Sequence, residues 1–252
     1  MVEVIRGEKT KDEAVATIFQ LAKKMGKTPV VVKDGPGFLV NRLLLPWMSE
    51  ALFLLEDGLS VEKLDHIYTH KFGMPMGPCR LMDEVGLDVG MKVLKIFKGA
   101  FGKRIQTSKL VEKVESSSRL GRKGGQGFYL YDKKGKEIEV DKSIYKELGL
   151  GQPSDQLEEK EVIERGLFSM VNEAALALVE DHIVEKPEDV DLAMIMGTGF
   201  PPFRGGLLRY ADTLGTPYIV QELELLASRY GKRFTPTTPL LNMARTDRKF
   251  YS

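Results

Sequence analysis

The strongest constraint on the fold of this chain is an internal repeat, in which one order of helices and loops occurs twice. Each copy is expected to have a long apolar helix, a second helix, a loop rich in Gly and Pro, and a short segment that ends at a glycine. The corresponding segments are 38–57 and 163–181, 61–72 and 190–196, 73–78 and 197–206, and 80–86 and 207–215. Three acidic residues recur at matched positions, with a spacing that grows from 123 to 129 residues as small loop insertions produce: Glu50 with Glu173, Asp65 with Asp191, and Asp83 with Asp212. This spacing is far above that of solenoid repeats, so it predicts two packed helical domains.

The first 33 residues follow a different pattern, that of a parallel strand–helix–strand unit. Residues Val2 to Ile5 and the apolar run from Pro29 to Val32 each predict a strand. Between them, apolar residues recur at three- and four-residue spacing from Ala14 to Met25, which predicts a helix that stops at Gly26. Parallel strands need cover on both faces, and no later segment supplies matching strands. We therefore expect the chain to begin inside an α/β domain whose remaining part lies upstream of Met1.

A complete nucleotide-binding motif is absent from the sequence. Three Gly-x-Gly pairs occur, at Gly35/Gly37, Gly125/Gly127 and Gly197/Gly199. None of them continues into the dinucleotide fingerprint, which follows a strand and opens a βαβ unit, and there is no P-loop. A bound nicotinamide dinucleotide would therefore need a domain that these 252 residues lack.

Composition narrows the class of protein further. The formal net charge of +1 gives no basic excess for nucleic-acid binding, and the apolar runs are too short to cross a membrane. Cys79 is the only cysteine, which excludes an internal disulfide and indicates a reducing compartment. His66 and His70 lie four residues apart on one expected helix, but no further ligand motif completes a site, so no metal site is expected. The polar stretch from 148 to 161 is the expected linker, which gives three parts: 1–33, 34–150 and 151–252.

Four motifs, taken in order, resemble the 3-hydroxyacyl-CoA dehydrogenase family: KTPVVVKDGPGFLVNRLLLPWMSEA, GMPMGPCRLMDEVGLD, GRKGGQGFYLY and GTGFPPFRGGLLRYADTLG. The resemblance covers almost the whole chain. Because there are two helical copies, it is to the dehydrogenase half of the multifunctional fatty-acid oxidation α-subunit, where an enoyl-CoA hydratase domain comes first. It implies a mainly α fold with two tandem helical domains of the dehydrogenase C-terminal type, preceded by the βαβ remnant of a Rossmann-like NAD-binding domain.

The resemblance also assigns roles to individual residues. In the family, a His-Phe-Phe-Asn-Pro segment that carries the catalytic base precedes the position of Met1, and it is missing here. Glu3 matches the acidic partner of that histidine, and the alternative is a solvated glutamate near the chain start. Asn41 matches a substrate-binding amide, and the alternative is a helix N-cap.

Two further residues are assigned in the same way. Lys123, in GRKGGQGF, matches a lysine that approaches the dinucleotide, and the alternative is a solvated loop lysine. Some multifunctional members have a substrate-contacting tyrosine just before the second Gly/Pro loop, and Met196 occupies that position here. In the family, the two Gly/Pro loops lie near the acyl-CoA site. The alternative for the loops of this chain is rigid packing between helices.

The function implied is oxidation of (S)-3-hydroxyacyl-CoA to 3-ketoacyl-CoA with NAD in β-oxidation, by the full-length enzyme, with these residues alone inactive. A bacterial protein of this kind would be cytoplasmic, and a eukaryotic one would lie in the mitochondrial matrix. The alternative is an assembly module that docks a thiolase subunit or a second copy of itself. A third reading is an independent acyl-CoA-binding module.

Overall fold

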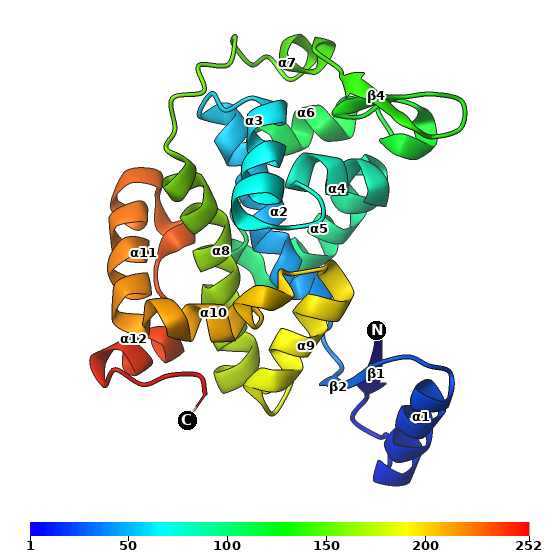
Figure 1. Ribbon diagram of the computed structural model, residues 1–252, viewed down its shortest axis with the longest axis vertical. Coiled ribbons are helices and arrows are strands. Elements are labelled where there is room, and N and C mark those ends of the chain that lie inside the picture. The colour runs from blue at the N-terminus through cyan, green and yellow to red at the C-terminus, as the bar shows by residue number, and fades with distance from the viewer. Residues whose placement is uncertain (252) are drawn as a thin grey trace. The chain divides into compact units, whose positions relative to one another are not determined.

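The computed structural model describes residues 1–251 and is mainly helical, with two small sheets (Figure 1). Its contacts divide the chain into two compact units. Unit 1 consists of Met1–Pro46 with Leu167–Ser252, and unit 2 is Trp47–Gly166. The three parts predicted from the sequence, 1–33, 34–150 and 151–252, are continuous segments, whereas the two units are defined by contacts in space. The three-part division therefore remains a prediction.

Unit 1 begins with a strand, a helix and a second strand: β1 (Val2–Arg6), α1 (Asp12–Lys24) and β2 (Pro29–Lys33). The two strands pair in parallel, with Glu3 opposite Val30, and α1 packs against both. The β-branched residues of the strands suit a pleated, buried surface, and Val30 is only 1% exposed.

The remaining elements of unit 1 are helical. They are the start of α2 (Val40–Glu56), the end of α8 (Glu159–Ala175), η4 (Leu176–Glu180), α9 (Pro187–Thr198), η5 (Pro202–Arg204), α10 (Leu207–Leu214), α11 (Thr216–Tyr230), η6 (Lys232–Phe234) and α12 (Thr238–Arg245). α10 packs against α9 and α11, and α12 packs against α11. α9 also contacts β2, so the helical part of the unit meets the small sheet at that strand.

Unit 2 repeats part of this order. It contains the end of α2, the start of α8, and α3 (Val61–His66), η1 (Ile67–Phe72), α4 (Pro78–Val85), α5 (Leu87–Phe101), η2 (Gly102–Arg104), α6 (Leu110–Ser116), η3 (Arg122–Gly124), β3 (Tyr129–Tyr131), β4 (Glu137–Val140) and α7 (Ser143–Glu147). α4 packs against α3 and α5, as α10 packs against α9 and α11. The helix predicted over 61–72 changes at Ile67 from an α-helix to a π-helix, and it ends at Gly73 in a left-handed conformation.

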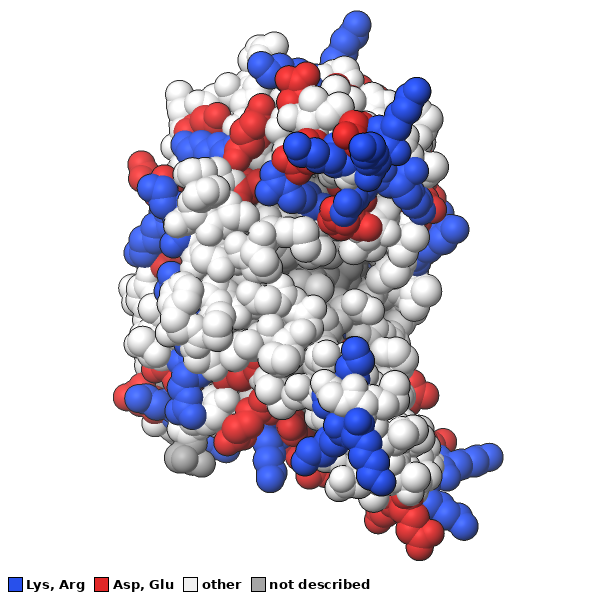
Figure 2. Space-filling model, turned by 45° about the vertical axis from the view of Figure 1, so that its right-hand side comes forward, with Lys and Arg blue, Asp and Glu red and all other residues white. Residues whose placement is uncertain are grey.

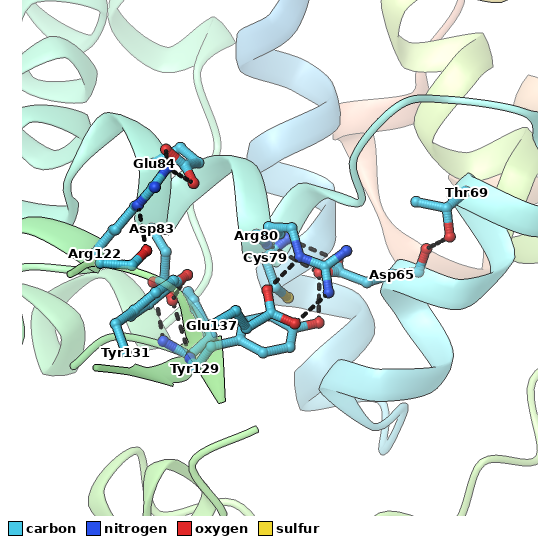
Figure 3. Close-up of polar contacts among 12 residues, drawn as sticks. Asp65, Thr69, Cys79, Arg80, Asp83, Glu84, Arg122, Tyr129, Tyr131 and Glu137 are labelled. Carbon is cyan, nitrogen blue, oxygen red and sulfur yellow. Dashed lines mark hydrogen bonds and ion pairs between the residues drawn. The ribbon is translucent and has the colours of Figure 1, made fainter. Parts of the chain in front are cut away.

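Two buried aspartates organise unit 2 (Figure 3). Asp65 accepts hydrogen bonds from the backbone N–H groups of Cys79 and Arg80 at the start of α4, both at 2.9 Å, and from the hydroxyl of Tyr129 at 2.7 Å. Asp83 accepts from the N–H groups of Phe128 and Tyr129, both at 2.9 Å. Together they tie the start of one helix and the strand β3 to the helical core, and they satisfy amides that would otherwise be buried without a partner.

Unit 1 contains the same arrangement. Asp191 accepts from the N–H groups of Leu208 and Arg209 at the start of α10, and from the hydroxyl of Tyr251 at 2.6 Å. Asp212 accepts from the N–H groups of Phe250 and Tyr251. The segment at Phe250–Tyr251 thus makes the contacts in unit 1 that Phe128–Tyr129 makes in unit 2.

Glycine is needed where these carboxylates approach the backbone. A Cβ atom on Gly127 would lie 2.0 Å from Asp83 Oδ1, and one on Gly206 would lie 2.4 Å from the Asp191 side chain. These distances are well inside van der Waals contact, so no larger residue fits without moving the backbone. Gly127 therefore serves packing and does not form part of a phosphate cradle.

Buried arginines pair with two carboxylates in each unit. In unit 2, the fully buried Arg165 side chain lies 2.6 Å from Glu50 Oε1 and 2.7 Å from Asp57 Oδ2. In unit 1, Arg42 lies 2.6 Å from Glu173 Oε1 and 2.5 Å from Asp181 Oδ2. In unit 2, Arg165 lies on α8, Glu50 lies on α2, and Asp57 directly follows α2. In unit 1, Arg42 lies on α2, Glu173 lies on α8, and Asp181 directly follows η4.

We expect Arg165→Met to lower the free energy of unfolding by about 3–5 kcal/mol, because it removes a buried positive charge that lies 2.6 Å from the 3%-exposed Glu50 side chain. Urea denaturation measures the change. Adding Glu50→Leu should restore a large part of the loss, since the uncompensated charge is then gone. Arg122→Met is the matched control, because the Arg122–Glu84 pair is exposed and should cost under about 1 kcal/mol. Equal losses for the two single variants would contradict the assignment.

Asp65 should make stability depend on pH. Burial raises the pKa of Asp65 to about 6, against the lowering effects of Tyr129, the two amides and Arg80. The protonated form is favoured by folding, so the contribution is complete below pH 3.8 and is lost as pH rises through about 6. The stability difference between the wild type and Asp65→Asn should therefore fall by about 3 kcal/mol between about pH 4 and pH 7. Urea denaturation across this range tests it, and a difference that is constant or rises with pH would show the reasoning to be wrong.

Candidate functional site

Unit 1 brings three of the four predicted site positions to one place, where the start of β1, the start of α2 and the end of α9 meet. Glu3, on β1, is half-buried, and its Oε1 accepts hydrogen bonds from the N–H groups of Leu39 at 2.9 Å and Val40 at 3.3 Å. A carboxylate at a helix N-terminus satisfies free amides and interacts favourably with the helix dipole. Glu3 is therefore an anchored side chain and not a freely solvated one.

The segment GPGF sets this geometry. Gly37 and Phe38 both adopt positive φ, 75° and 51°, and the Phe38 N–H donates to the carbonyl of Gly35 at 3.0 Å. A left-handed conformation is unusual for phenylalanine and costs conformational energy. The tight turn directs the amides of Leu39 and Val40 at Glu3.

Asn41 is exposed in the first turn of α2, next to the amide that Glu3 holds. Its side chain has no hydrogen-bond partner within residues 1–251. The expected alternative, a helix N-cap, does not apply, because α2 begins at Val40 and Asn41 therefore lies inside the helix, where its side chain bonds no helix amide of the described residues. The amide of Asn41 is thus free to donate to and accept from a bound molecule.

Met196 lies on the last turn of α9 and is 49% exposed. The next residue, Gly197, fits closely against the start of α2, since a Cβ atom there would lie 3.2 Å from Val40 Cγ2 and 2.7 Å from Met1 Cε. Val40 is therefore shared: its backbone bonds to Glu3, and its side chain meets the turn that carries Met196.

Lys123 belongs to unit 2 and stands on η3. Its Nζ lies 2.5 Å from Asp88 Oδ1, in the first turn of α5, and this lysine lowers the pKa of Asp88. A pocket of about 490 Å³ surrounds it, lined by Glu84, Arg122, Lys123, Gly125, Asp132, Lys133 and Gly135. Figure 2 shows charged side chains of both signs gathered over the end of this unit that carries β4. No sequence motif indicated a role for Asp88, which lies 35 residues before the lysine that it holds.

Other titratable groups of unit 2 serve structure. Cys79 is fully buried, and burial raises the pKa of its thiol well above the usual range, with Asp65 adding to the effect. His66 and His70 stack with their ring centroids 4.3 Å apart. In the part of the chain that the structure describes, no group of three or more His, Cys, Asp or Glu side chains is suited to a metal ion. Over the same residues, no helix is long and apolar enough to cross a membrane.

The residues of unit 1 do not form a cradle for a dinucleotide. The connection from β1 to α1 contains a single glycine, Gly7, and α1 opens with Asp12 and Glu13. Two carboxylates at the helix N-terminus repel a pyrophosphate, which a dinucleotide site places at that end.

Two sequence profiles match the chain. The profile of the 3-hydroxyacyl-CoA dehydrogenase NAD-binding domain matches residues 1–35, and that of the C-terminal domain of the same enzymes matches residues 37–131. The fatty acid oxidation complex subunit alpha of Shewanella halifaxensis is 48% identical over all 252 residues, and that of Vibrio parahaemolyticus is 45% identical over 251. The chain spans 35% of the length of each of these curated relatives.

Solved structures agree on the fold. The 3-hydroxybutyryl-CoA dehydrogenase of Escherichia coli matches 97% of this chain and 67% of its own, with a TM-score of 0.76 and 23% identity. The dehydrogenase part of multifunctional enzyme 1 from C. elegans matches 95% of this chain and 55% of its own, with a TM-score of 0.68 and 28% identity. With both profiles in order along the sequence, the chain belongs to the 3-hydroxyacyl-CoA dehydrogenase family.

Proposed function

We propose that these residues form the substrate side of an NAD-dependent (S)-3-hydroxyacyl-CoA dehydrogenase of fatty-acid β-oxidation. The observation that carries the proposal is that the carboxylate of Glu3, on β1, holds the amides of Leu39 and Val40 at the start of α2, whose first turn also carries the exposed side chain of Asn41. In the proposed enzyme, the catalytic histidine and most of the dinucleotide site come from residues other than these 252. The chain alone would therefore be inactive.

Glu3 would orient the catalytic histidine. One carboxylate oxygen is fixed by two backbone amides, and the other has no partner within residues 1–251. That oxygen can accept a hydrogen bond from an imidazole N–H and stabilise the ring as it takes the proton of the substrate hydroxyl. Anchoring by the backbone fixes the direction of this bond, which a solvated glutamate would not do.

Asn41 would position the acyl-CoA. An amide both donates and accepts hydrogen bonds without titrating, so it suits the 3-hydroxy and the 3-keto forms alike. Met196 would line the same site with an apolar surface. Lys123 would contact the dinucleotide, with Asp88 holding its Nζ until the anionic ligand arrives.

We further propose the domain history that the sequence predicts: residues 1–33 as the end of an NAD-binding domain, and 34–150 and 151–252 as two copies of one helical domain. The match of the first profile to residues 1–35 supports the first part. Support for the second comes from the recurring contacts of Asp65 and Asp191 with a helix start and a tyrosine.

A second candidate function is assembly. The curated relatives are named as subunits of a complex, so docking to a thiolase subunit or to a second copy is proposed beside the catalytic role. A cytoplasmic location is proposed with it, as for a bacterial enzyme of this family. The two roles are compatible, because Glu3, Asn41 and Met196 occupy only a small part of unit 1.

The purified chain should give no NADH from (S)-3-hydroxybutyryl-CoA and NAD. A fusion to the upstream residues of the Shewanella relative should be active, and Asn41→Ala in that fusion should lower kcat/KM about 10- to 100-fold, as loss of one or two hydrogen bonds to substrate does. Asn242→Ala, at an exposed asparagine of α12, is the control and should have no effect. NADH formation by the chain alone, or full activity of Asn41→Ala, would refute the assignment.

Glu3→Gln in the same fusion should lower kcat by roughly 100-fold or more, while the amide oxygen still accepts from Leu39 and Val40 and keeps the fold. The acid limb of the pH–rate profile should move to lower pH, because the imidazolium form loses its counter-charge. Steady-state rates across pH measure both effects. Glu8→Gln, at an exposed glutamate of the β1–α1 connection, should leave the profile in place. An unshifted profile in Glu3→Gln would mean that Glu3 acts only on structure.

A further inference from the structure

Arg119, which follows α6 in unit 2, is a buried arginine that binds four acceptors at once. Its side chain is only 2% exposed. Nε donates to Glu147 at 2.6 Å, and Nη1 donates to the carbonyl of Gly127 at 2.6 Å and to Asp141 at 2.7 Å. Nη2 donates to the hydroxyl of Ser143 at 2.7 Å. The planar guanidinium has a fixed geometry, so it holds these partners in one arrangement.

One of these partners belongs to residues 121–127, GRKGGQG, which we call the glycine loop. The ends of this loop meet, because the N–H of Gly121 donates to the carbonyl of Gln126 at 2.9 Å. On one side the loop lies against Asp83, since a Cβ atom on Gly121 would lie 2.4 Å from the Asp83 carbonyl oxygen. On the other side, Arg119 holds the last carbonyl of the loop. The backbone of the glycine loop is therefore fixed between a core aspartate and a core arginine.

Asp141 extends this contact to the exposed part of the glycine loop. Its Oδ2 accepts hydrogen bonds from Arg119 and, at 2.6 Å, from the side-chain amide of Gln126. Its Oδ1 accepts from the N–H and the hydroxyl of Ser143. Burial by itself would raise the pKa of Asp141, but the hydrogen bonds from Gln126, Ser143 and Arg119 lower it to about 2. The Asp141 carboxylate therefore stays charged at neutral pH and keeps its hold on the loop.

The glycine loop carries two ion-paired cations. Arg122 Nη1 lies 2.7 Å from Glu84 Oε1 on α4, a pair that Figure 3 shows. Lys123 Nζ lies 2.5 Å from Asp88 Oδ1 on α5, and the Lys123 side chain is 48% exposed. A long lysine side chain loses rotamer freedom when it binds a ligand, and a fixed backbone limits this cost because fewer positions are lost. The position that the Lys123 ammonium takes therefore depends on the shape of the loop.

We propose that Arg119 is a positioning residue for Lys123, because it locks the glycine loop in the shape that presents the Lys123 ammonium to the dinucleotide. The inference rests on the dinucleotide contact of Lys123 under the proposed function, and it adds that a core residue controls this contact. With the loop released, Lys123 would keep its charge but sample many positions, so the dinucleotide would bind less tightly. Arg119 would then act on dinucleotide binding and not on the acyl-CoA.

Steady-state kinetics of the fusion described above test the proposal. Arg119→Lys keeps the charge but lacks the fork that holds the four acceptors, so KM for NAD should rise about 5- to 10-fold, with kcat and KM for the acyl-CoA within about twofold. Gln126→Met removes only the exposed bond to Asp141 and should raise KM for NAD about twofold. Arg80→Lys is the matched control: Arg80 binds Glu137 on β4 through two N–H groups, and its loss should leave KM for NAD in place. Circular dichroism and urea denaturation check that each variant folds.

The variant Lys123→Ala separates positioning from a general loss of structure. If Arg119 acts through Lys123, adding Arg119→Lys to Lys123→Ala should give no further rise in KM for NAD. A structural defect would add to the effect of Lys123→Ala and would raise KM for the acyl-CoA as well. Either of these results would overturn the proposal.

Acetylation of lysines in the 252-residue chain gives a readout that needs no enzymatic activity. An N-hydroxysuccinimide ester of acetate, followed by peptide mass spectrometry, measures the reactivity of Lys123 against that of the exposed Lys136. Lys123 should react slowly while it is paired with Asp88, and Arg119→Lys should speed its reaction about threefold, as loss of a surface ion pair does. An unchanged rate would refute the control of Lys123 by Arg119. A faster rate, combined with no effect of Lys123→Ala on KM for NAD, would refute the proposed dinucleotide contact and this inference with it.

Discussion

The buried guanidinium of Arg165 is the interaction on which the packing of α2 and α8 in unit 2 depends. A charge with no exposed surface is stable only when counter-charges satisfy it, and Glu50 and Asp57 do so at 2.6 and 2.7 Å. Glu50 lies on α2 and Asp57 directly follows it. These two ion pairs therefore determine the position of α8 along the axis of α2. Arg42 repeats the solution in unit 1, with Glu173 and Asp181 as its partners. Apolar residues supply most of the burial around these clusters, but they do not by themselves fix how far one helix slides along another.

Carboxylates that accept hydrogen bonds from backbone amides occur in both units. They differ in whether both carboxylate oxygens are bonded or only one. Asp65 and Asp191 each use both oxygens on amides and a tyrosine hydroxyl. Their buried positions leave nothing for a ligand. Glu3 is bonded through one oxygen only, at the edge of the molecule, where a second polar group can reach the other. The same kind of contact therefore closes a core at Asp65 and Asp191, and at Glu3 it leaves one carboxylate oxygen for the orienting role proposed above.

The sequence predicted the elements better than the contacts. The periodicity of apolar residues located the helices, and the repeat matched Asp65 with Asp191 and Asp83 with Asp212. It did not predict what these carboxylates bind, because Tyr129 lies 64 residues from Asp65 and only tertiary packing brings them together. Nor did it predict that the helix continues after His66 as a π-helix, because apolar spacing does not distinguish a π-helix from an α-helix over six residues. At the site, the sequence did not predict the positive φ of Phe38 or the bond from Glu3 to the start of α2, because that bond joins residues 36 positions apart. The sequence left two roles for Asn41, a helix cap or a ligand-binding group, and the start of α2 at Val40 excludes the cap.

The chain separates positioning from chemistry. Dehydrogenation needs a base to take the hydroxyl proton and a dinucleotide to take the hydride. The groups found in unit 1 do neither: an amide that does not titrate, an anchored carboxylate and an apolar side chain. They do fix direction, because the amides of Leu39 and Val40 hold Glu3, and the turn at Gly197 packs against Val40. Stability for this arrangement comes from elsewhere, from the arginine clusters and the aspartates at the helix starts, none of which touches the site. In the proposed enzyme, a fold built in this way would hold Glu3 and Asn41 in place before the histidine and the dinucleotide bind, because none of the groups that stabilise the fold takes part in the reaction.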